Sequence, residues 1–291
     1  MGMHGEFAAN IAIQKADLLI ACGMRFDDRV TGNTKTYSLN SKKIHIEIDP
    51  SEINKNVPVD IALVGDLKTV LRKLLPVLDK QSNSEWIDSI SKWHRESQSR
   101  DIINMDTQML YGAQVISDIW KETNGDAIVV SDVGQHQMLE AQYYKHDEPN
   151  TLLTSGGLGT MGFSLPAAIG ASFSNRDKDI WVIVGDGSIQ MTITELATAV
   201  QENANIKIAI INNGYLGMVR QWQQLFYDSR YSETPISSPD YVKLSEAYGL
   251  KGFRVISRPE IPGVIKEAQN IKGPVLVEFV VEQHDMVYPM V

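Results

Sequence analysis

The sequence predicts an α/β protein built from two doubly wound, mostly parallel sheets. Short apolar runs of strand length alternate with helical segments over residues 1–80, and the same alternation returns over residues 108–291. Such alternation is typical of parallel sheets that are covered by helices. Residues 81–107 are polar between these two regions, which predicts a linker. Two domains are therefore expected.

The composition is typical of a soluble globular protein. The chain has 291 residues, of which 43% are hydrophobic and 22% charged. Its net charge of −9 argues against a nucleic-acid partner, and no apolar run is long enough to cross a membrane. The single cysteine, Cys22, excludes an internal disulfide and indicates a reducing compartment, the cytoplasm or an organelle. Its apolar neighbours predict a buried thiol.

The first region predicts three strands. The expected elements, in order, are a helix over 7–15, strands over 17–22, 43–48 and 62–64, and a helix over 67–78. Ser51 is expected to cap a short helical turn after the second strand, and Asp66 to cap the last helix. In the linker, a helix over 85–99 places Trp86, Ile90 and Trp93 on one face, which favours packing onto a domain.

Ligands of a parallel sheet bind beyond the carboxyl ends of its strands. The candidates in the first region are Gly2, Met3, His4, Gly5, Gly23, Arg25, Asp28, Arg29, Glu47, Ile48, Gly65 and Asp66. A Gly-rich turn before a helix can bind an anion, and an acid at a strand end can bind a ribose. These residues fit an adenine dinucleotide site and simple turn and capping roles equally well.

The second region predicts at least five strands with interleaved helices. Strands are expected over 127–131, 181–184, 207–211, 252–255 and 274–280. Helices are expected over 111–122, from after Met138 to about 144, and over 163–173, 192–203, 239–248 and 259–269, and a loop and helix over 214–226. The second sheet is thus also expected to be doubly wound.

Two strand ends of the second region carry polar motifs. The strand 181–184 runs into Gly185-Asp186-Gly187, and the strand 207–211 ends in Asn212-Asn213. Because parallel strands end at the same edge of a sheet, Asp186 and Asn213 can share a hard cation such as Mg²⁺ or Ca²⁺. The alternative is a tight turn and a plain strand terminus. The pairing, with 24 residues between the two motifs, resembles the thiamine-diphosphate (ThDP) binding motif of ThDP-dependent enzymes.

Several further motifs resemble the large, catalytic subunit of acetolactate synthase, also called acetohydroxyacid synthase. They are GMHG at 2–5, GMRFDDRVTG at 23–32, VGQHQM at 133–138, TSGGLGTMGFSLPAAIGA at 154–171 and NNGYLGMVRQWQ at 212–223. The resemblance implies that 1–80 is the C-terminal part of a central, Rossmann-like FAD-binding domain. It implies that 108–291 is the C-terminal domain that binds Mg²⁺ and the diphosphate of ThDP.

The resemblance also implies the cofactor sites. Mg²⁺ would be held by the side chains of Asp186 and Asn213 and the backbone oxygen of Tyr215. ThDP would contact Gly159, Met161, Gly185, Gly187, Ser188, Gly217 and Met218. Met161 would lie between the two ThDP rings, the alternative being a core methionine. FAD would contact Gly2, Met3, His4, Gly5, Gly23, Arg25, Glu47, Ile48, Glu52, Gly65 and Asp66, although Glu47 stands where many relatives carry Asp.

The implied reaction is a carboligation. Pyruvate is decarboxylated and its hydroxyethyl unit joins a second 2-keto acid, pyruvate or 2-ketobutyrate, in branched-chain amino-acid biosynthesis. Gln135 and His136 would line the active site, with a structural His136 equally open. Trp222, Met218 and Val219 would contact the acceptor side chain. Arg29 would bind its carboxylate, unless Arg29 only pairs with Asp28. A related flavin-linked pyruvate oxidase or another ThDP-dependent keto-acid decarboxylase is the alternative.

The family's N-terminal pyrimidine-binding domain, with its activating glutamate, has no counterpart in this sequence. The resemblance therefore implies a longer chain that works as a homodimer or tetramer, because this glutamate acts on the cofactor of the partner subunit. A regulatory small subunit is a further implied partner. We expect no more than trace activity from the 291 residues alone.

Overall fold

The computed structural model describes residues 1–98 and 101–289, which divide into two compact units. The first unit holds the residues up to Asp101 and the segment from Tyr288 onward, and the second holds Ile102–Val287. Each unit has one sheet, and the strand pairs within both sheets are parallel throughout the described residues. The predicted fold class is confirmed.

The first unit is built on a three-stranded sheet of order β1-β2-β3. Its strands are β1 (Leu18–Cys22), β2 (Lys42–Glu47) and β3 (Ile61–Val64). Its helices are η1 (Gly2–His4), α1 (Phe7–Lys15), α2 (Asp28–Thr31), η2 (Pro50–Glu52), α3 (Leu67–Leu74), η3 (Leu75–Val77) and α4 (Ser84–Gln98). Ala21, Phe26, Tyr37 and Val57 form its small core.

Two local predictions for this unit were wrong. Cys22 is exposed, because alternation along β1 puts it on the same sheet face as Leu18 and Ile20, which are 48% and 47% exposed. Asp49, not Ser51, caps the turn of η2, since the Asp49 carboxylate accepts the backbone N–H of Ser51 over 2.9 Å. The capping role of Asp66 is confirmed by its hydrogen bond from the Thr69 N–H.

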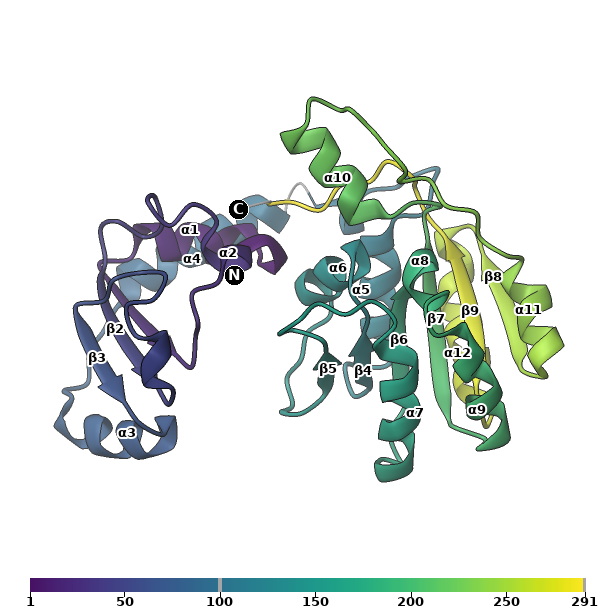
Figure 1. The fold of residues 1–291 in the computed structure, drawn as a ribbon, viewed down its shortest axis with the longest axis horizontal. Coiled ribbons are helices and arrows are strands. Elements are labelled where there is room, and N and C mark those ends of the chain that lie inside the picture. Colours follow the sequence, from purple (N-terminus) through teal and green to yellow (C-terminus); the bar gives the residue numbers. More distant parts are fainter. Residues whose placement is uncertain (99–100, 290–291) are drawn as a thin grey trace. The chain divides into compact units, whose positions relative to one another are not determined.

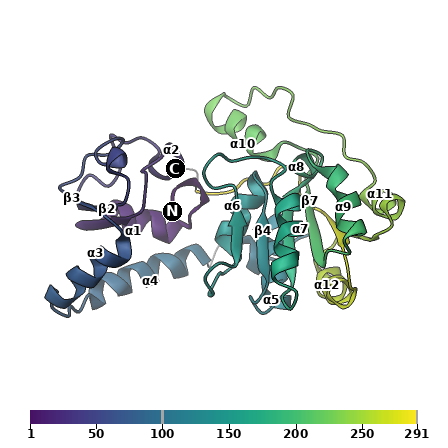
Figure 2. The ribbon, with the colours of Figure 1, turned by 60° about the horizontal axis from the view of Figure 1, so that its bottom comes forward.

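The predicted linker contains a helix that packs on the first unit. Helix α4 lies against α1 (Figure 2), and the Lys15 ammonium lies 5.0 Å from the centre of the Trp93 ring. Trp86 and Trp93 pack edge to face with their ring centres 5.7 Å apart. Residues 81–101 therefore belong to the first compact unit, where the sequence had suggested a separate linker. The expected last residue of this helix, Ser99, lies outside the described residues.

The second unit is built on a six-stranded sheet of order β5-β4-β6-β7-β9-β8. Its strands are β4 (Ile128–Ser131), β5 (Leu152–Thr154), β6 (Ile180–Gly185), β7 (Ile206–Asn212), β8 (Lys251–Val255) and β9 (Val275–Val280). The short strand β5 was not predicted, because three residues before a Gly-rich loop give no clear pattern.

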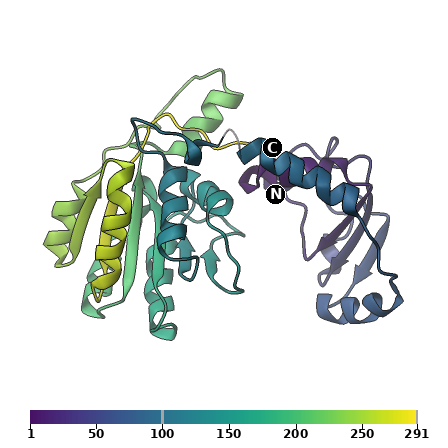
Figure 3. The same ribbon diagram turned by 180° about the vertical axis from the view of Figure 1, so that it is seen from behind.

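Helices cover both faces of this sheet (Figures 1 and 3). One face carries α7 (Ser164–Ser174), α9 (Leu196–Gln201) and α11 (Tyr241–Tyr248), and the other carries α5 (Gly112–Glu122), α6 (Gln135–Tyr143) and α12 (Ile261–Asn270). The remaining helices are η4 (Ile102–Asn104), α8 (Asp186–Ile189), η5 (Ile193–Glu195), α10 (Gly217–Phe226) and η6 (Arg258–Glu260).

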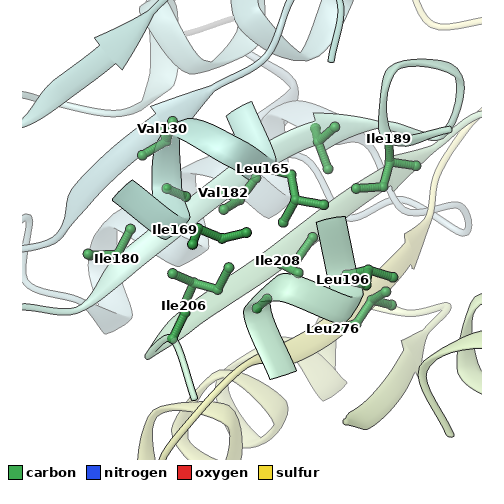
Figure 4. Packing of buried hydrophobic residues seen from close by; sticks show 14 of the residues in the cluster. Val130, Leu165, Ile169, Ile180, Val182, Ile189, Leu196, Ile206, Ile208 and Leu276 are labelled. Carbon is green, nitrogen blue, oxygen red and sulfur yellow. The ribbon is translucent and has the colours of Figure 1, made fainter. Parts of the chain in front are cut away.

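The core of the second unit fixes the two central strands. Side chains of α7 and α9, among them Leu165 and Leu196, pack onto β6 and β7 (Figure 4). All of β6, and all of β7 except its last residue, is buried. This burial gives the loops at the strand ends a rigid base. No helix in the described part of the chain has both the length and the apolar character that crossing a membrane requires.

Candidate functional site

A cavity of about 210 Å³ lies in the second unit at the carboxyl ends of its strands. The sheet order places β6 on one side of β4 and β5 on the other, so the chain changes direction between β4 and β6. Such a switch point is where open parallel sheets bind ligands. Of the residues predicted for the site, the cavity is lined by Gln135, His136, Gly159, Met161, Gly185, Asp186, Gly187, Ser188, Asn213, Tyr215, Gly217, Met218 and Val219.

Asp186 follows β6 directly and its side chain is buried, with 1% of its surface exposed. Its Oδ2 accepts the backbone N–H of Gly214 over 3.0 Å and the hydroxyl of Ser238 over 3.1 Å. Burial raises the pKa of this carboxyl group to about 6, and the two hydrogen bonds oppose the rise. A cation bound beside Asp186 would therefore strongly stabilise the charged form of this carboxyl group.

The loop after β7 is tied to Asp186 through one backbone group. The N–H of Gly214 donates to Asp186 and also to the Oδ1 of Asn212 over 3.1 Å. Asn213 uses its Oδ1 to accept the N–H of Tyr215 and its Nδ2 to donate to Gln135 over 3.2 Å. The expectation that the two motifs meet at one sheet edge is therefore confirmed.

The donor set fits a hard cation. Asp186 forms no ion pair with a basic side chain in residues 1–98 and 101–289, so the hydrogen bonds from Gly214 and Ser238 are not joined there by a positively charged partner. The same residues contain no cluster of three His, Cys, Asp or Glu side chains arranged to bind a metal. The predicted oxygen ligands are the Asp186 carboxylate, the Asn213 amide and the Tyr215 carbonyl, and all three residues line the same cavity. Mg²⁺ accepts such a sparse oxygen set, because it keeps waters and binds ligand phosphates.

The Gly-rich loop that carries Met161 is held by Asp132, a residue that was not predicted to belong to the site. Asp132 is fully buried, and its Oδ1 accepts the N–H groups of Val133 and Gly162, each over 2.9 Å. Its Oδ2 accepts the N–H of Ser164 over 2.8 Å. Three backbone donors on one carboxylate fix the loop to the end of β4. The strand-end position of Asp132 was the signal available in the sequence.

His136 lies at the start of α6 with its ring against two glycines. A Cβ atom on Gly134 would lie 2.7 Å from the ring and one on Gly185 2.8 Å from it, so both positions must be glycine for the ring to fit. Its Nε2 is buried without a hydrogen-bond partner in the structure. Burial lowers the pKa of His136 to about 4, which makes the ring neutral at pH 7. His136 thus contributes a neutral ring to the cavity wall.

Part of the cavity wall comes from the segment after β9. Val281, Glu282, Asp285 and Val287 line it, as do Gly112 and Leu139 from α5 and α6. Burial raises the pKa of Asp285 to about 6, and the charge of Glu282 adds to this rise. The amino-acid sequence of this segment matches no binding pattern, so its place in the site was not predicted. Only the fold brings the segment back to the cavity.

Trp222 and Arg29 are not among the residues that line the cavity. Trp222 packs edge to face on Phe226, with ring centres 5.7 Å apart, while Met218 and Val219 of the same helix reach the cavity. Arg29 lies in the first unit, half exposed, and pairs with Asp28 over 3.0 Å. The ion pair that was the alternative for Arg29 is therefore present.

The proposed FAD positions all lie in the first unit. Most of them follow its strands, whereas residues 2–5 lie in and directly after η1, which packs on α2. Glu47 is buried, and its Oε1 accepts the N–H groups of Ile48 and Asp49 over 2.8 and 3.2 Å. Arg25 pairs with Asp27, and Glu52 with Lys55. These contacts order the strand-end loops. FAD binding itself stays a prediction.

Comparison with known proteins gives one consistent answer. The family described as thiamine pyrophosphate enzyme, C-terminal TPP binding domain, matches residues 132–279, and the central domain of these enzymes matches residues 1–74. The whole chain is 45% identical to the acetolactate synthase large subunit of Corynebacterium glutamicum and 42% identical to the acetolactate synthase isozyme 3 large subunit of Escherichia coli. It is 44% identical to the mitochondrial acetolactate synthase catalytic subunit of Saccharomyces cerevisiae.

The chain spans about half the length of the curated relatives it matches, since it covers 48%, 52% and 44% of these three. The resemblance to acetolactate synthase large subunits that the motifs indicated is confirmed over the whole chain.

Proposed function

The chain belongs to the thiamine pyrophosphate enzymes, and from this premise we propose that its second unit holds the diphosphate end of ThDP through Mg²⁺. The observation that carries the proposal is the buried Asp186 carboxylate, tied to the Asn212-Asn213 loop at the switch point of the sheet. In this proposal, Asp186, Asn213 and the Tyr215 carbonyl bind the cation. Gly187 and Ser188 contact the phosphates.

The neighbouring residues would shape the remainder of the site. A Cβ atom on Gly187 would lie 2.9 Å from the Cδ2 of Leu216 and 3.2 Å from the Cδ1 of Ile236, so a side chain at this position would crowd two apolar neighbours. Met161 reaches the same place, with its Cε 3.9 Å from that position. Its unbranched side chain suits a contact with the face of a flat ring. Gln135 and the neutral His136 would present polar atoms to the bound molecule.

The reaction that we propose for the complete protein is acetolactate synthesis. ThDP supplies a carbanion and an electron sink when it is bound. The residues of this chain would then orient the cofactor, exclude water and contact the second keto acid through Met218 and Val219. The identity of 42–45% to acetolactate synthase large subunits over the whole chain supports this reaction. Roles for Trp222 and Arg29 in acceptor binding are part of the same proposal.

Further proposals concern the first unit and the partners. Its match to the central domain of the family supports the proposed FAD contacts there. A homodimer or tetramer, and a regulatory small subunit, are proposed because several relatives are named large subunits. A location in the cytoplasm, or in an organelle of a eukaryote, is proposed on the same basis, since the yeast relative is named mitochondrial.

Calorimetric titration of the 291-residue chain with ThDP tests the proposal. We expect saturable binding in the presence of Mg²⁺ and none in the presence of EDTA. Equal binding in both conditions would exclude the proposed metal link. For the reaction, a complete enzyme should form acetolactate from pyruvate without net flavin reduction under anaerobic conditions. Rapid flavin reduction by pyruvate would instead support the pyruvate oxidase alternative.

A further inference from the structure

Gln221 is a fully buried polar side chain, and all of its side-chain hydrogen bonds join it to residues that are far away in the sequence. Its Nε2 donates to the carbonyl of Val287 over 2.7 Å, and its Oε1 accepts the N–H of Val287 over 3.0 Å. This pair of bonds attaches helix α10 to the segment 281–287 by both backbone groups of one residue. Neither residue was selected from the sequence.

A third hydrogen bond joins Gln221 to the proposed cation site. The Nε2 of Gln135 donates to the Oε1 of Gln221 over 2.7 Å and to the carbonyl of Asp285 over 3.2 Å. The Oε1 of Gln135 in turn accepts the Nδ2 of Asn213 over 3.2 Å. The nitrogen and the oxygen of the Gln221 amide therefore both have hydrogen-bond partners. The hydrogen bonds form a chain that runs from Val287 through Gln221 and Gln135 to Asn213.

We propose that Gln221 is a positioning residue that holds the segment 281–287 in the cavity wall and, through Gln135, orients Asn213. Val281, Glu282, Asp285 and Val287 line the cavity, so the position of the segment sets the shape of the site. Asn213 needs a fixed amide orientation to turn an oxygen, not a nitrogen, toward a cation. Two hydrogen bonds set that orientation: the one from its Nδ2 to Gln135, and the one that its Oδ1 accepts from the N–H of Tyr215. The part that concerns Asn213 rests on the proposed function.

Other side chains at this position cannot replace the amide. Methionine has a similar length but no strong hydrogen-bonding group, so it would remove one of the two acceptors of the Gln135 Nε2 and leave both backbone groups of Val287 without their Gln221 partner in a buried place. Glutamate keeps the acceptor but replaces the donor by a second acceptor, which would face the carbonyl of Val287. Because the unpaired groups can regain partners only from water, the segment is expected to leave the wall.

Helix α10 also provides a matched control. Gln223 makes the same two-bond contact with Ser232, donating to its carbonyl over 3.1 Å and accepting its N–H over 2.9 Å. This contact is exposed, and neither residue lines the cavity. The Gln223→Met variant therefore removes the same kind of contact from the same helix without touching the chain of bonds to Asn213.

Amide hydrogen exchange of the cofactor-free chain tests the positioning of the segment. We expect Gln221→Met to speed exchange in residues 282–287 by about tenfold relative to the wild type, as expected for losing the net value of one or two hydrogen bonds. Gln223→Met should leave those amides unchanged. If Gln221→Met fails to fold, Val287→Pro removes the N–H donor from the segment itself and should give the same increase.

Titration with Mg²⁺ and ThDP tests the link to Asn213. Gln221→Met should weaken binding about tenfold, whereas Gln223→Met should change it less than about twofold. A folded Gln221→Met chain with unchanged exchange in 282–287 would overturn the inference. Faster exchange with unchanged binding would overturn its link to Asn213. Absence of binding by the wild type would instead count against the proposed function, and the exchange result would stand independently.

Discussion

The backbone N–H of Gly214 donates a hydrogen bond to Oδ2 of Asp186 over 3.0 Å. This bond joins the loop after β7 to the first residue after β6, which lie 28 positions apart in the sequence. It holds the proposed ligands in place before any cation binds. A site prepared in this way loses less conformational freedom on binding than a flexible one.

The first prediction concerns the charge of Asp186. The Asp186→Asn change should weaken Mg²⁺-dependent ThDP binding by about 100-fold or more, because it removes the single carboxylate proposed to bind the cation. Calorimetric titration measures this. The Ser238→Ala change, which removes one hydrogen bond to the same carboxylate, serves as the graded control and should have a smaller effect. Equal affinities of wild type and Asp186→Asn would refute the assignment.

The second prediction concerns pH and Asp285. Because burial raises the pKa of Asp285 to about 6, the folded chain holds this proton more tightly than the unfolded chain does. Its ionisation therefore destabilises the fold as the pH rises from about 4 through 6. Asp285→Asn should be more stable than the wild type at pH 8 by about 1–3 kcal/mol, and no more stable at pH 4.

Urea unfolding at the two pH values measures this difference. Asp228→Asn is the control, since the Asp228 side chain is 93% exposed and its replacement should cause no such pH-dependent gain. A constant stability difference between Asp285→Asn and the wild type at both pH values would contradict the prediction.

The third prediction concerns the loop that carries Met161. Asp132→Asn keeps the size of the side chain but turns one acceptor into a donor, which then faces the backbone N–H groups that Asp132 binds. The change should lower the free energy of unfolding by about 2–3 kcal/mol, because the lost bonds are buried and charge-assisted. Urea unfolding checks this.

Ser155→Ala is the matched control for that change. It removes one exposed hydrogen bond from the same loop, the one to the Thr160 N–H, and should cost less than about 1 kcal/mol. If Asp132→Asn cost no more than Ser155→Ala, Asp132 would not hold the loop.

The fourth prediction concerns the tight packing at Gly217. A Cβ atom there would lie 2.0 Å from the Oε1 of Gln135 and 2.7 Å from the Nδ2 of Asn213. Gly217→Ala should therefore separate these two side chains, lower stability by about 1–3 kcal/mol and weaken ThDP binding. Gly156→Ala has open space around it and should change stability by less than about 0.5 kcal/mol. Thermal unfolding measures the stability of both variants, and titration with ThDP measures their affinity for the cofactor.

The sequence predicted most of the second sheet and the meeting of its two motifs. The strands β6 and β7 are long apolar runs with polar ends, and the handedness of parallel crossovers then places Asp186 and Asn213 at one edge. It did not reveal Asp132, Gln221 or the segment after β9. Their roles depend on hydrogen bonds to backbone groups far away in the chain, and such bonds leave no periodic pattern in the sequence.

The prediction that Cys22 is buried was wrong for a related reason. An apolar run predicts a strand but not which of its faces is buried, because that depends on helices and loops elsewhere in the chain. Similarly, the helix predicted over 67–78 ends as α-helix at Leu74 and continues as η3, where Pro76 removes a backbone donor. Local sequence patterns therefore predicted the helices and strands themselves better than they predicted which other parts of the chain cover them.

The cavity wall combines Gly112, near the start of the second unit, with Val287, at its end. During synthesis on the ribosome, the sheet can begin to form while the wall is still incomplete. Until the last residues of the unit emerge, Gln221 has no carbonyl to donate to, and the apolar lining faces water. The wall of the proposed cofactor site would therefore be complete only when the whole unit has been made, and a chain that ended near residue 281 would lack the part of the wall that Glu282, Asp285 and Val287 supply.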